Sequence, residues 1–83
     1  MDPSVNLLLV DDDGRNLDVL ESILTASDCQ LFRAQSAEEA LLALIKRDFA
    51  AIVLDIQLPG MNGFEFAKLI KQRKRNRQIP IIF

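Results

Sequence analysis

Short apolar runs alternate along the chain with segments that repeat apolar residues at helical spacing. The runs have the length and composition of strands, and the segments between them are typical of amphipathic helices. We expect four strands, at residues 5–10, 29–34, 50–55 and 79–83, and three helices, at residues 15–26, 37–47 and 64–75. Strands and helices that alternate over short connections predict an α/β fold, with a parallel sheet covered on both faces. A chain of 83 residues is expected to form one domain.

Two local motifs add detail to this pattern. Ser36 and Glu39 have the spacing of a capping box, which predicts that the second helix starts at residue 37. Leu58-Pro59-Gly60-Met61 has proline and glycine at the two central positions of a type II turn. The chain is therefore expected to reverse direction sharply soon after the third strand.

Acidic residues follow the first strand and end the third. Asp11, Asp12 and Asp13 come directly after the first strand, and Asp55 is the last residue of the third. If the sheet has the flavodoxin-like order 2-1-3-4, these strands are neighbours and their carboxyl ends lie about 4.8 Å apart. Asp11, Asp12 and Asp55 then meet in one crevice, at the edge where open α/β sheets bind ligands.

Three carboxylates in one crevice predict a bound cation. Like charges at this spacing repel by roughly a few kcal/mol, even at an effective dielectric constant near 20. Because all the candidate ligands are hard oxygen atoms, we expect Mg²⁺ to neutralise them. A cation with open coordination positions also attracts phosphoryl oxygens. The simplest reaction for such a site is phosphoryl transfer onto a carboxylate, with Asp55 as the expected centre.

Composition excludes several other classes of site. The chain has no histidine, which removes Ser-His and Cys-His catalysis, histidine metal ligands and any role as a phosphohistidine donor. Cys29 is the only cysteine, so an internal disulfide is excluded and a reducing compartment, the cytoplasm, is expected. No apolar run approaches the roughly 20 residues that span a bilayer. Residues 1–4 lack the positive charge of a signal peptide, so none is expected.

Charge is distributed unevenly along the chain. Residues 1–67 hold twelve acidic and four basic residues, whereas residues 68–83 hold six basic residues and no acidic one. Aromatic residues are not interleaved with this basic run, and cations suit the C-terminal end of a helix. We therefore interpret the run as a solvated face, with an anionic partner as the alternative and nucleic acid disfavoured.

Taken together, these motifs resemble the receiver domain of two-component response regulators. The resemblance covers the chain from Val5 onward. Its specific parts are Leu8-Leu9-Val10-Asp11-Asp12 at the end of the first strand and the segment 54–63, Leu-Asp-Ile-Gln-Leu-Pro-Gly-Met-Asn-Gly, after the third. Asn16 and the fourth strand, Ile79-Pro80-Ile81-Ile82, are also similar to the family.

The resemblance implies a role for each residue of the site. Asp55 would be the phosphoacceptor, Asp12 a direct Mg²⁺ ligand and Asp11 a ligand that acts mainly through water. The backbone carbonyl of Gln57 would complete the protein's share of the coordination. The phosphoryl donor would be a phosphohistidine on a sensor histidine kinase or a phosphotransfer protein, so the domain would accept the group without being an enzyme.

The family pattern also extends past the last residue of this sequence. Receiver domains continue with a Thr or Ser at the tip of the fourth strand, another helix, a fifth strand that ends in Lys, and a last helix. We therefore expect the 83 residues to be a fragment that ends within or just after the fourth strand. The hydroxyl and the lysine that hold the phosphoryl oxygens are expected to be missing.

Two other functions remain open from the sequence. Asp11-Asp12-Asp13-Gly14 after a strand also resembles the first motif of haloacid-dehalogenase-type phosphatases, in which Asp11 would be the nucleophile and Asp13 the acid/base. Asp13 is otherwise expected at the surface. The second alternative is an interaction module that associates with itself through an exposed strand edge at Ile81-Ile82-Phe83, without phosphorylation.

Overall fold

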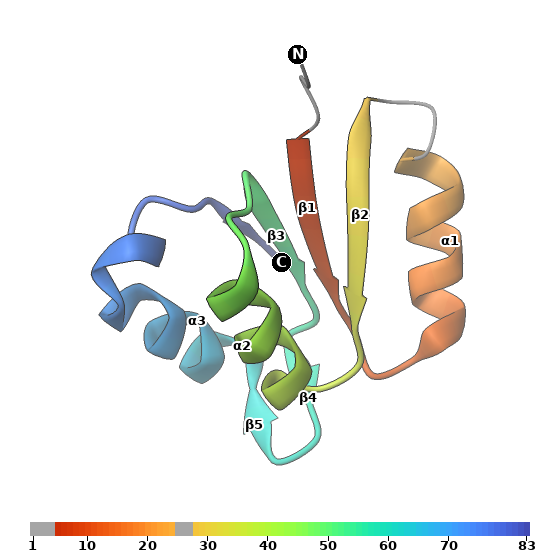
Figure 1. The fold of residues 1–83 in the computed structure, drawn as a ribbon. Helices are drawn as coiled ribbons and strands as arrows, with labels where there is room; N and C mark the ends of the chain where they lie inside the picture. Colours follow the sequence, from red (N-terminus) through yellow and green to blue (C-terminus); the bar gives the residue numbers. More distant parts are fainter. Residues whose placement is uncertain (1–4, 25–27) are drawn as a thin grey trace.

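The computed structural model describes residues 5–24 and 28–83, with the side chain of Gln57 left aside. The strands of its main sheet are β1 (Val5–Val10), β2 (Cys29–Ala34), β3 (Ala51–Leu54) and β6 (Ile81–Ile82). The helices are α1 (Gly14–Leu24), α2 (Ala37–Lys46) and α3 (Gly63–Gln72), followed by a short 3₁₀ turn at Lys74–Asn76. A small hairpin, β4 (Gln57–Leu58) and β5 (Met61–Asn62), projects from one end of the molecule (Figure 1).

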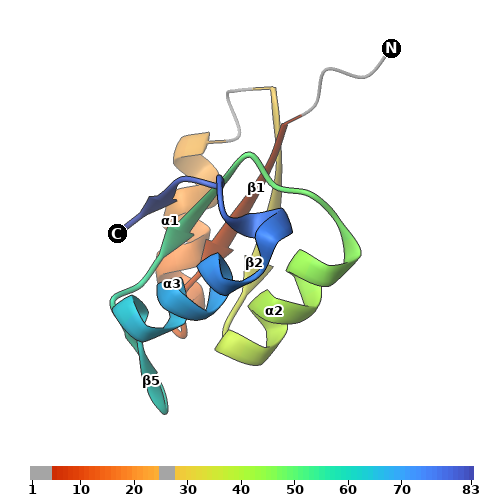
Figure 2. The same cartoon turned by 90° about the vertical axis from the view of Figure 1, so that its left-hand side faces the viewer.

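The main sheet is parallel, with the order β2-β1-β3-β6. Helix α1 covers one face, and α2 and α3 lie together on the other, as the two views show (Figures 1 and 2). This arrangement confirms the predicted α/β class, the flavodoxin-like order and the helices on both faces. Within the described residues, none of the helices has the length and the apolar character that a membrane crossing requires.

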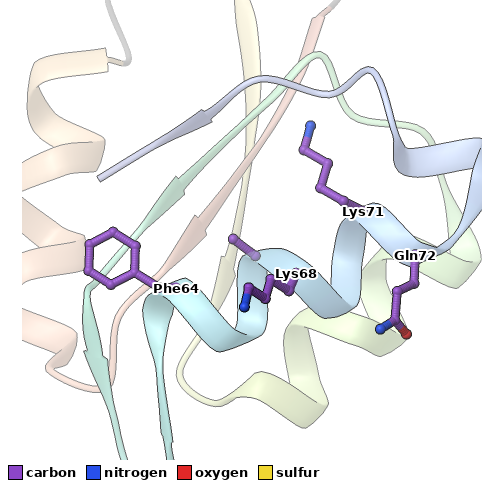
Figure 3. A pocket seen from close by; sticks show the side chains of 5 residues that line it. Phe64, Lys68, Lys71 and Gln72 are labelled. Carbon is purple, nitrogen blue, oxygen red and sulfur yellow. The ribbon is translucent and has the colours of Figure 1, made fainter.

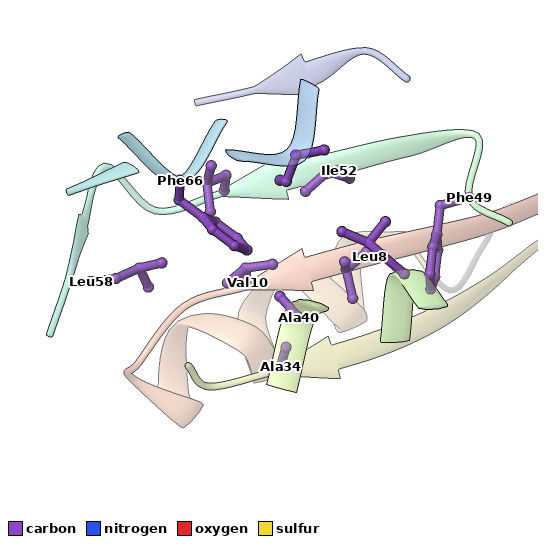
Figure 4. Close-up of a cluster of buried hydrophobic side chains, with 11 residues drawn as sticks. Leu8, Val10, Ala34, Ala40, Phe49, Ile52, Leu58 and Phe66 are labelled. Carbon is purple, nitrogen blue, oxygen red and sulfur yellow. The ribbon is translucent and has the colours of Figure 1, made fainter. Parts of the chain in front are cut away.

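The main core lies between the sheet and the pair α2 and α3 (Figure 4). Side chains of alternate strand residues enter it, because successive residues of a strand point to opposite faces. Phe66 from α3 is fully buried at its centre. The residues that form this core are Leu8, Val10, Ala34, Ala40, Leu44, Phe49, Ile52, Leu54, Leu58, Phe66 and Ile70. On the opposite face, Leu9 of β1 and Leu17 of α1 are also fully buried.

The capping box that the sequence predicts before α2 forms in part. The Ser36 hydroxyl accepts a hydrogen bond from the Glu39 N–H at 3.1 Å. The Glu39 carboxylate, however, accepts from the N–H of Gln35 at 3.0 Å, one residue before the cap. Both side chains therefore satisfy backbone donors at the start of the helix, which fixes the point where β2 turns into α2.

Several predicted boundaries were wrong, most of them by one or two residues. The third strand spans 51–54 where 50–55 was predicted, α2 ends at 46 where 47 was predicted, and α1 begins at 14 where 15 was predicted. The last two residues predicted for the first helix, 25 and 26, lie outside the described residues. The β4–β5 hairpin was not predicted as strands, although its turn was. Gly60 has a φ of 79°, the conformation that a type II turn requires there.

The largest differences lie between α3 and the last strand. Helix α3 was predicted for 64–75, but it spans 63–72 and gives way to extended backbone at Arg73. Two side-chain contacts explain the early end. Lys71 donates hydrogen bonds to the carbonyls of Arg77 and Ile79, and Arg75 pairs with Asp48. The last strand was predicted for 79–83 and spans only Ile81–Ile82. The Pro80 carbonyl still accepts from the N–H of Ile52 at 3.0 Å, but proline has no N–H to donate in return.

Candidate functional site

The carboxyl ends of β1 and β3 meet at one edge of the main sheet. Val10 lies opposite Leu54 in the register of the two strands, so Asp11 and Asp55 follow at neighbouring positions. The N–H of Asp55 donates to the carbonyl of Val10 at 2.9 Å, which extends the pairing by one step. The backbone ladder therefore places the two acidic segments side by side.

Carboxylate oxygens of Asp11, Asp12 and Asp55 all lie within 4.8 Å of one another. Asp11 is buried, Asp55 is half-buried and Asp12 is exposed, so the group opens to solvent on one side. The sequence-based prediction that these three carboxylates come together is confirmed. Their roles as ligands and phosphoacceptor stay predictions.

Two hydrogen bonds hold the Asp11 carboxylate in place. One oxygen accepts from the N–H of Asp13 at 2.9 Å, and the other accepts from the side-chain amide of Asn16 at 3.1 Å. Asn16 lies in the first turn of α1, so the start of that helix supports the acidic group. The sequence pointed to Asn16 only as a family-like residue and did not predict this contact.

Asp13 takes no part in the acidic group and binds Arg15 instead. Both of its oxygens accept from the Arg15 guanidinium, at 3.2 and 3.1 Å. These bonds lower the pKa of Asp13 and raise that of Arg15. A carboxyl group with a lowered pKa is a weaker proton donor at neutral pH, so this contact does not favour the acid/base role that the phosphatase alternative assigns to Asp13.

Gln57 begins β4 and pairs with Asn62 of β5. Its backbone lies two residues beyond Asp55, on the hairpin that leaves the edge of the sheet (Figure 1). The predicted contribution of its carbonyl to a cation site remains a prediction. The hairpin does place this stretch of backbone at the same end of the molecule as the acidic group.

The donor set of the acidic group fits Mg²⁺. It consists of three carboxylates, two of them partly or fully withdrawn from water, and carboxylate oxygens are ligands that this ion prefers. The exposed side at Asp12 leaves access for water or a further oxygen ligand. Arg15 binds Asp13, so the positive charge of Arg15 lies beside a carboxylate that is not part of the acidic group.

An open α/β sheet with an acidic group at the carboxyl ends of its central strands defines a class of ligand-binding domains. Comparison with known proteins identifies the family within that class. Residues 7–83 match the family model described as the response regulator receiver domain. The chain therefore belongs to the response regulator receiver domain family, as the sequence motifs indicated.

Relatives and solved structures agree with this assignment. The chain is 33% identical over 85 residues to hybrid signal transduction histidine kinase L of Dictyostelium discoideum, covering 95% of this chain and 5% of that protein. It is similar to chemotaxis response regulator CheY4 of Vibrio cholerae, with a TM-score of 0.88, 28% identity and coverage of 94% and 65%. Response regulator TrrA of Thermotoga maritima, in complex with Mg²⁺-BeF, has a TM-score of 0.82, 28% identity and coverage of 93% and 65%.

The chain is shorter than the proteins that it matches. It spans a third or less of the curated relatives compared, for example 33% of stress response regulator protein 1 of Debaryomyces hansenii. It covers about two thirds or less of the matched solved chains. The comparisons therefore establish the family and the fold of this chain, and its activity and partners remain proposals.

Proposed function

We propose that this receiver domain accepts a phosphoryl group on Asp55 in a two-component signalling system. The observation that carries the proposal is the meeting of Asp11, Asp12 and Asp55 within 4.8 Å at the ends of β1 and β3. Asp55 is half-buried at the end of a central strand, which holds its carboxylate at a fixed place but within reach of a donor. Membership of the receiver family supports this reading of the site.

The proposed reaction transfers a phosphoryl group from a histidine of another protein. An oxygen of the Asp55 carboxylate attacks the phosphorus atom, the bond between phosphorus and the imidazole nitrogen breaks, and the nitrogen keeps the electron pair and later takes a proton from water. The product on this chain is an aspartyl phosphate. Under this proposal the domain is an acceptor and not an enzyme, and the donor histidine belongs to another protein, because this sequence contains none.

Asp11, Asp12 and Asp55, with the backbone carbonyl of Gln57, would hold Mg²⁺ at this site. The ion supplies positive charge, which offsets the repulsion between the acidic group and an incoming phosphoryl group. Asn16 and the N–H of Asp13 keep Asp11 oriented toward the others. The complex of TrrA with Mg²⁺-BeF supports a magnesium site in this fold.

A sensor histidine kinase or a phosphotransfer protein is the proposed donor. The similarity to part of a hybrid signal transduction histidine kinase supports a kinase as partner. We place the domain in the cytoplasm, which fits a chain with a single cysteine. Nucleic acid and membrane are not proposed as partners, since Arg75 pairs with Asp48 and Lys71 with backbone carbonyls.

Phosphorylation in the presence and absence of Mg²⁺ tests the proposal. We expect the chain to gain one phosphoryl group from a phosphohistidine donor or from acetyl phosphate, and to lose most of this reactivity when EDTA removes the metal. Intact-mass spectrometry follows the reaction, and borohydride reduction followed by peptide mapping locates the acyl phosphate. Equal labelling with EDTA, or a label at a residue other than Asp55, would contradict the proposal.

Self-association is a second part of the proposal. Within the described residues β6 is one of the two edge strands of the main sheet, and Ile82 and Phe83 are 55% and 51% exposed. The ring of Phe83 packs against Phe64, which also lines a hollow on α3 with Ala67, Lys68, Lys71 and Gln72 (Figure 3). The unpaired backbone groups of an edge strand are a template for another strand.

A second copy of the chain is the partner that charge favours for this edge. Basic residues precede β6, and the acidic group lies at the opposite, carboxyl end of the sheet. Antiparallel pairing of two β6 strands would place the basic end of each copy near the acidic end of the other. We expect a dimer in sedimentation at high protein concentration that salt weakens. A monomer across the whole concentration range would contradict this part.

A further inference from the structure

Gly63, the first residue of α3, lies in direct backbone contact with the segment that carries Asp55. A Cβ atom placed on Gly63 would lie 2.7 Å from the carbonyl oxygen of Asp55 and 2.7 Å from the Cα of Ile56. It would also lie 3.0 Å from the carbonyl oxygen of Ile56. All three neighbours are main-chain atoms, so no side-chain rotation relieves the overlap. A side chain at this position would have to displace the backbone next to Asp55.

The same contact includes a hydrogen bond. The N–H of Gly63 donates to the carbonyl of Ile56, so the start of α3 holds the residue that follows Asp55. The first turn of α3 is itself fixed, because the Asn62 side chain accepts from the Glu65 N–H at 2.9 Å and Phe66 is fully buried. The contact therefore joins the Asp55 segment to a helix start that the Asn62 cap and the buried Phe66 hold in place.

On its other side, the Asp55 segment is tied to β1. The N–H of Asp55 donates to the carbonyl of Val10 at 2.9 Å, one residue before Asp11. The backbone at 55–56 is thus held between β1 and the first residue of α3. The contact with Gly63 is therefore a second anchor, in addition to the ladder with β1, for the segment that carries Asp55.

We propose that Gly63 is a positioning residue for Asp55: its lack of a side chain lets α3 pack directly on the Asp55–Ile56 backbone, its N–H donates to the Ile56 carbonyl, and both contacts together set the spacing of the acidic group. This inference rests on the proposed role of Asp55 and adds a residue that touches neither the cation nor the phosphoryl group. Gly63 acts through the backbone. An added methyl group pushes Asp55 away from α3 and changes the spacing of the three carboxylates.

Gly60 provides a matched control three residues earlier, at the tip of the hairpin. It has a φ of 79°, so alanine is strained there, but a Cβ at Gly60 would meet no heavy atom within 4 Å. Gly60→Ala therefore tests the general cost of replacing a glycine in this loop. Gly63→Ala tests the close approach to Asp55 in addition.

The experiment compares Gly63→Ala and Gly60→Ala with the unchanged chain at a temperature where each is folded. Mg²⁺ affinity is measured by calorimetry, and phosphorylation by intact mass with acetyl phosphate. We expect Gly63→Ala to weaken Mg²⁺ binding about tenfold, the size of effect seen when support of a metal ligand is lost. Its phosphorylation should slow by about tenfold or more, since a misplaced reacting group is costly.

The control variant should behave differently. Gly60→Ala should lower the thermal midpoint by about 5 °C, through backbone strain, and keep Mg²⁺ affinity within about twofold. In amide NMR spectra without metal, Gly63→Ala should shift the resonances of Asp55, Ile56 and Val10. Shifts from Gly60→Ala should stay within the hairpin. A folded Gly63→Ala chain with unchanged Mg²⁺ affinity would overturn the inference.

If Gly63→Ala does not fold, a second variant keeps the test open. An ester in place of the amide between Asn62 and Gly63 removes the N–H donor without adding an atom, and it should weaken Mg²⁺ binding about threefold or more. Unchanged affinity in the ester chain would overturn the inference. Failure of the proposed function is a separate result: it would show as an unchanged chain that neither binds Mg²⁺ nor forms an acyl phosphate.

Discussion

Replacing Asp55 with asparagine is expected to abolish formation of the acyl phosphate. Asparagine has nearly the same shape as aspartate, but its amide is not a nucleophile toward phosphorus. Asp55 is half-buried and its N–H pairs with Val10 in the strand ladder, so the variant should keep the fold. With acetyl phosphate and Mg²⁺, intact-mass spectrometry should detect no phosphorylated Asp55→Asn chain while the unchanged chain reacts.

Asp13→Asn is the matched control for this prediction. Asp13 also follows the first strand, but its carboxylate binds Arg15 and lies outside the acidic group. We expect Asp13→Asn to be phosphorylated at nearly the normal rate. The phosphatase alternative predicts the reverse, because it assigns the chemistry to Asp11 and Asp13. Phosphorylation that survives Asp55→Asn and is lost in Asp13→Asn would reject Asp55 as the acceptor.

Replacing Phe66 with alanine is expected to have the largest effect on stability. Phe66 is fully buried in the core between the sheet and the pair α2 and α3 (Figure 4). Removing a buried phenyl ring costs about 3–5 kcal/mol through lost burial and the cavity that remains. A chain of 83 residues has a free energy of unfolding of roughly 4–12 kcal/mol. The variant should therefore lose a large part of its stability, which urea unfolding followed by circular dichroism would measure.

Phe64→Ala is the control on the same helix. Phe64 is 56% exposed and packs only against the ring of Phe83 among the described aromatic residues. We expect this change to cost about 0.5–1.5 kcal/mol, the usual value of an aromatic pair. Similar losses from Phe64→Ala and Phe66→Ala would mean that α3 does not pack on the sheet as described. That result would also remove the support that Phe66 gives to the start of α3.

The alternation of strands and helices could be predicted because it depends on local patterns. The apolar runs before Asp11 and Asp55 are strands, and the segment after Ser36 is a helix, as predicted. The meeting of Asp11, Asp12 and Asp55 also followed from the sequence, once the order of the strands was assumed. Parallel strands bring their carboxyl ends to the same end of the sheet. The register of β1 and β3 then places the residues that follow them, Asp11 and Asp55, at neighbouring positions.

The features that the sequence did not predict depend on contacts between distant segments. Helix α3 ends early because Arg75 and Lys71 find partners elsewhere, and helical spacing cannot reveal such partners. The contact of Asn16 with Asp11 depends on the path of the backbone between β1 and α1, which a pattern of apolar residues does not specify. The close approach of Gly63 to Asp55 is likewise a matter of packing. In the sequence, Gly63 stood out as the end of the family-like segment 54–63 and as part of an Asn-Gly pair, and neither signal indicates a contact with the Asp55 backbone.

Titration of the chain with Mg²⁺, followed residue by residue in amide NMR spectra, tests the central claim most directly. If Asp11, Asp12 and Asp55 share one ion, resonances of residues 10–13 and 55–57 should shift together and saturate with a single affinity. The Asp12→Asn variant should weaken that affinity. The account would be contradicted if these resonances stayed unchanged at saturating Mg²⁺, or if the two segments responded with different affinities.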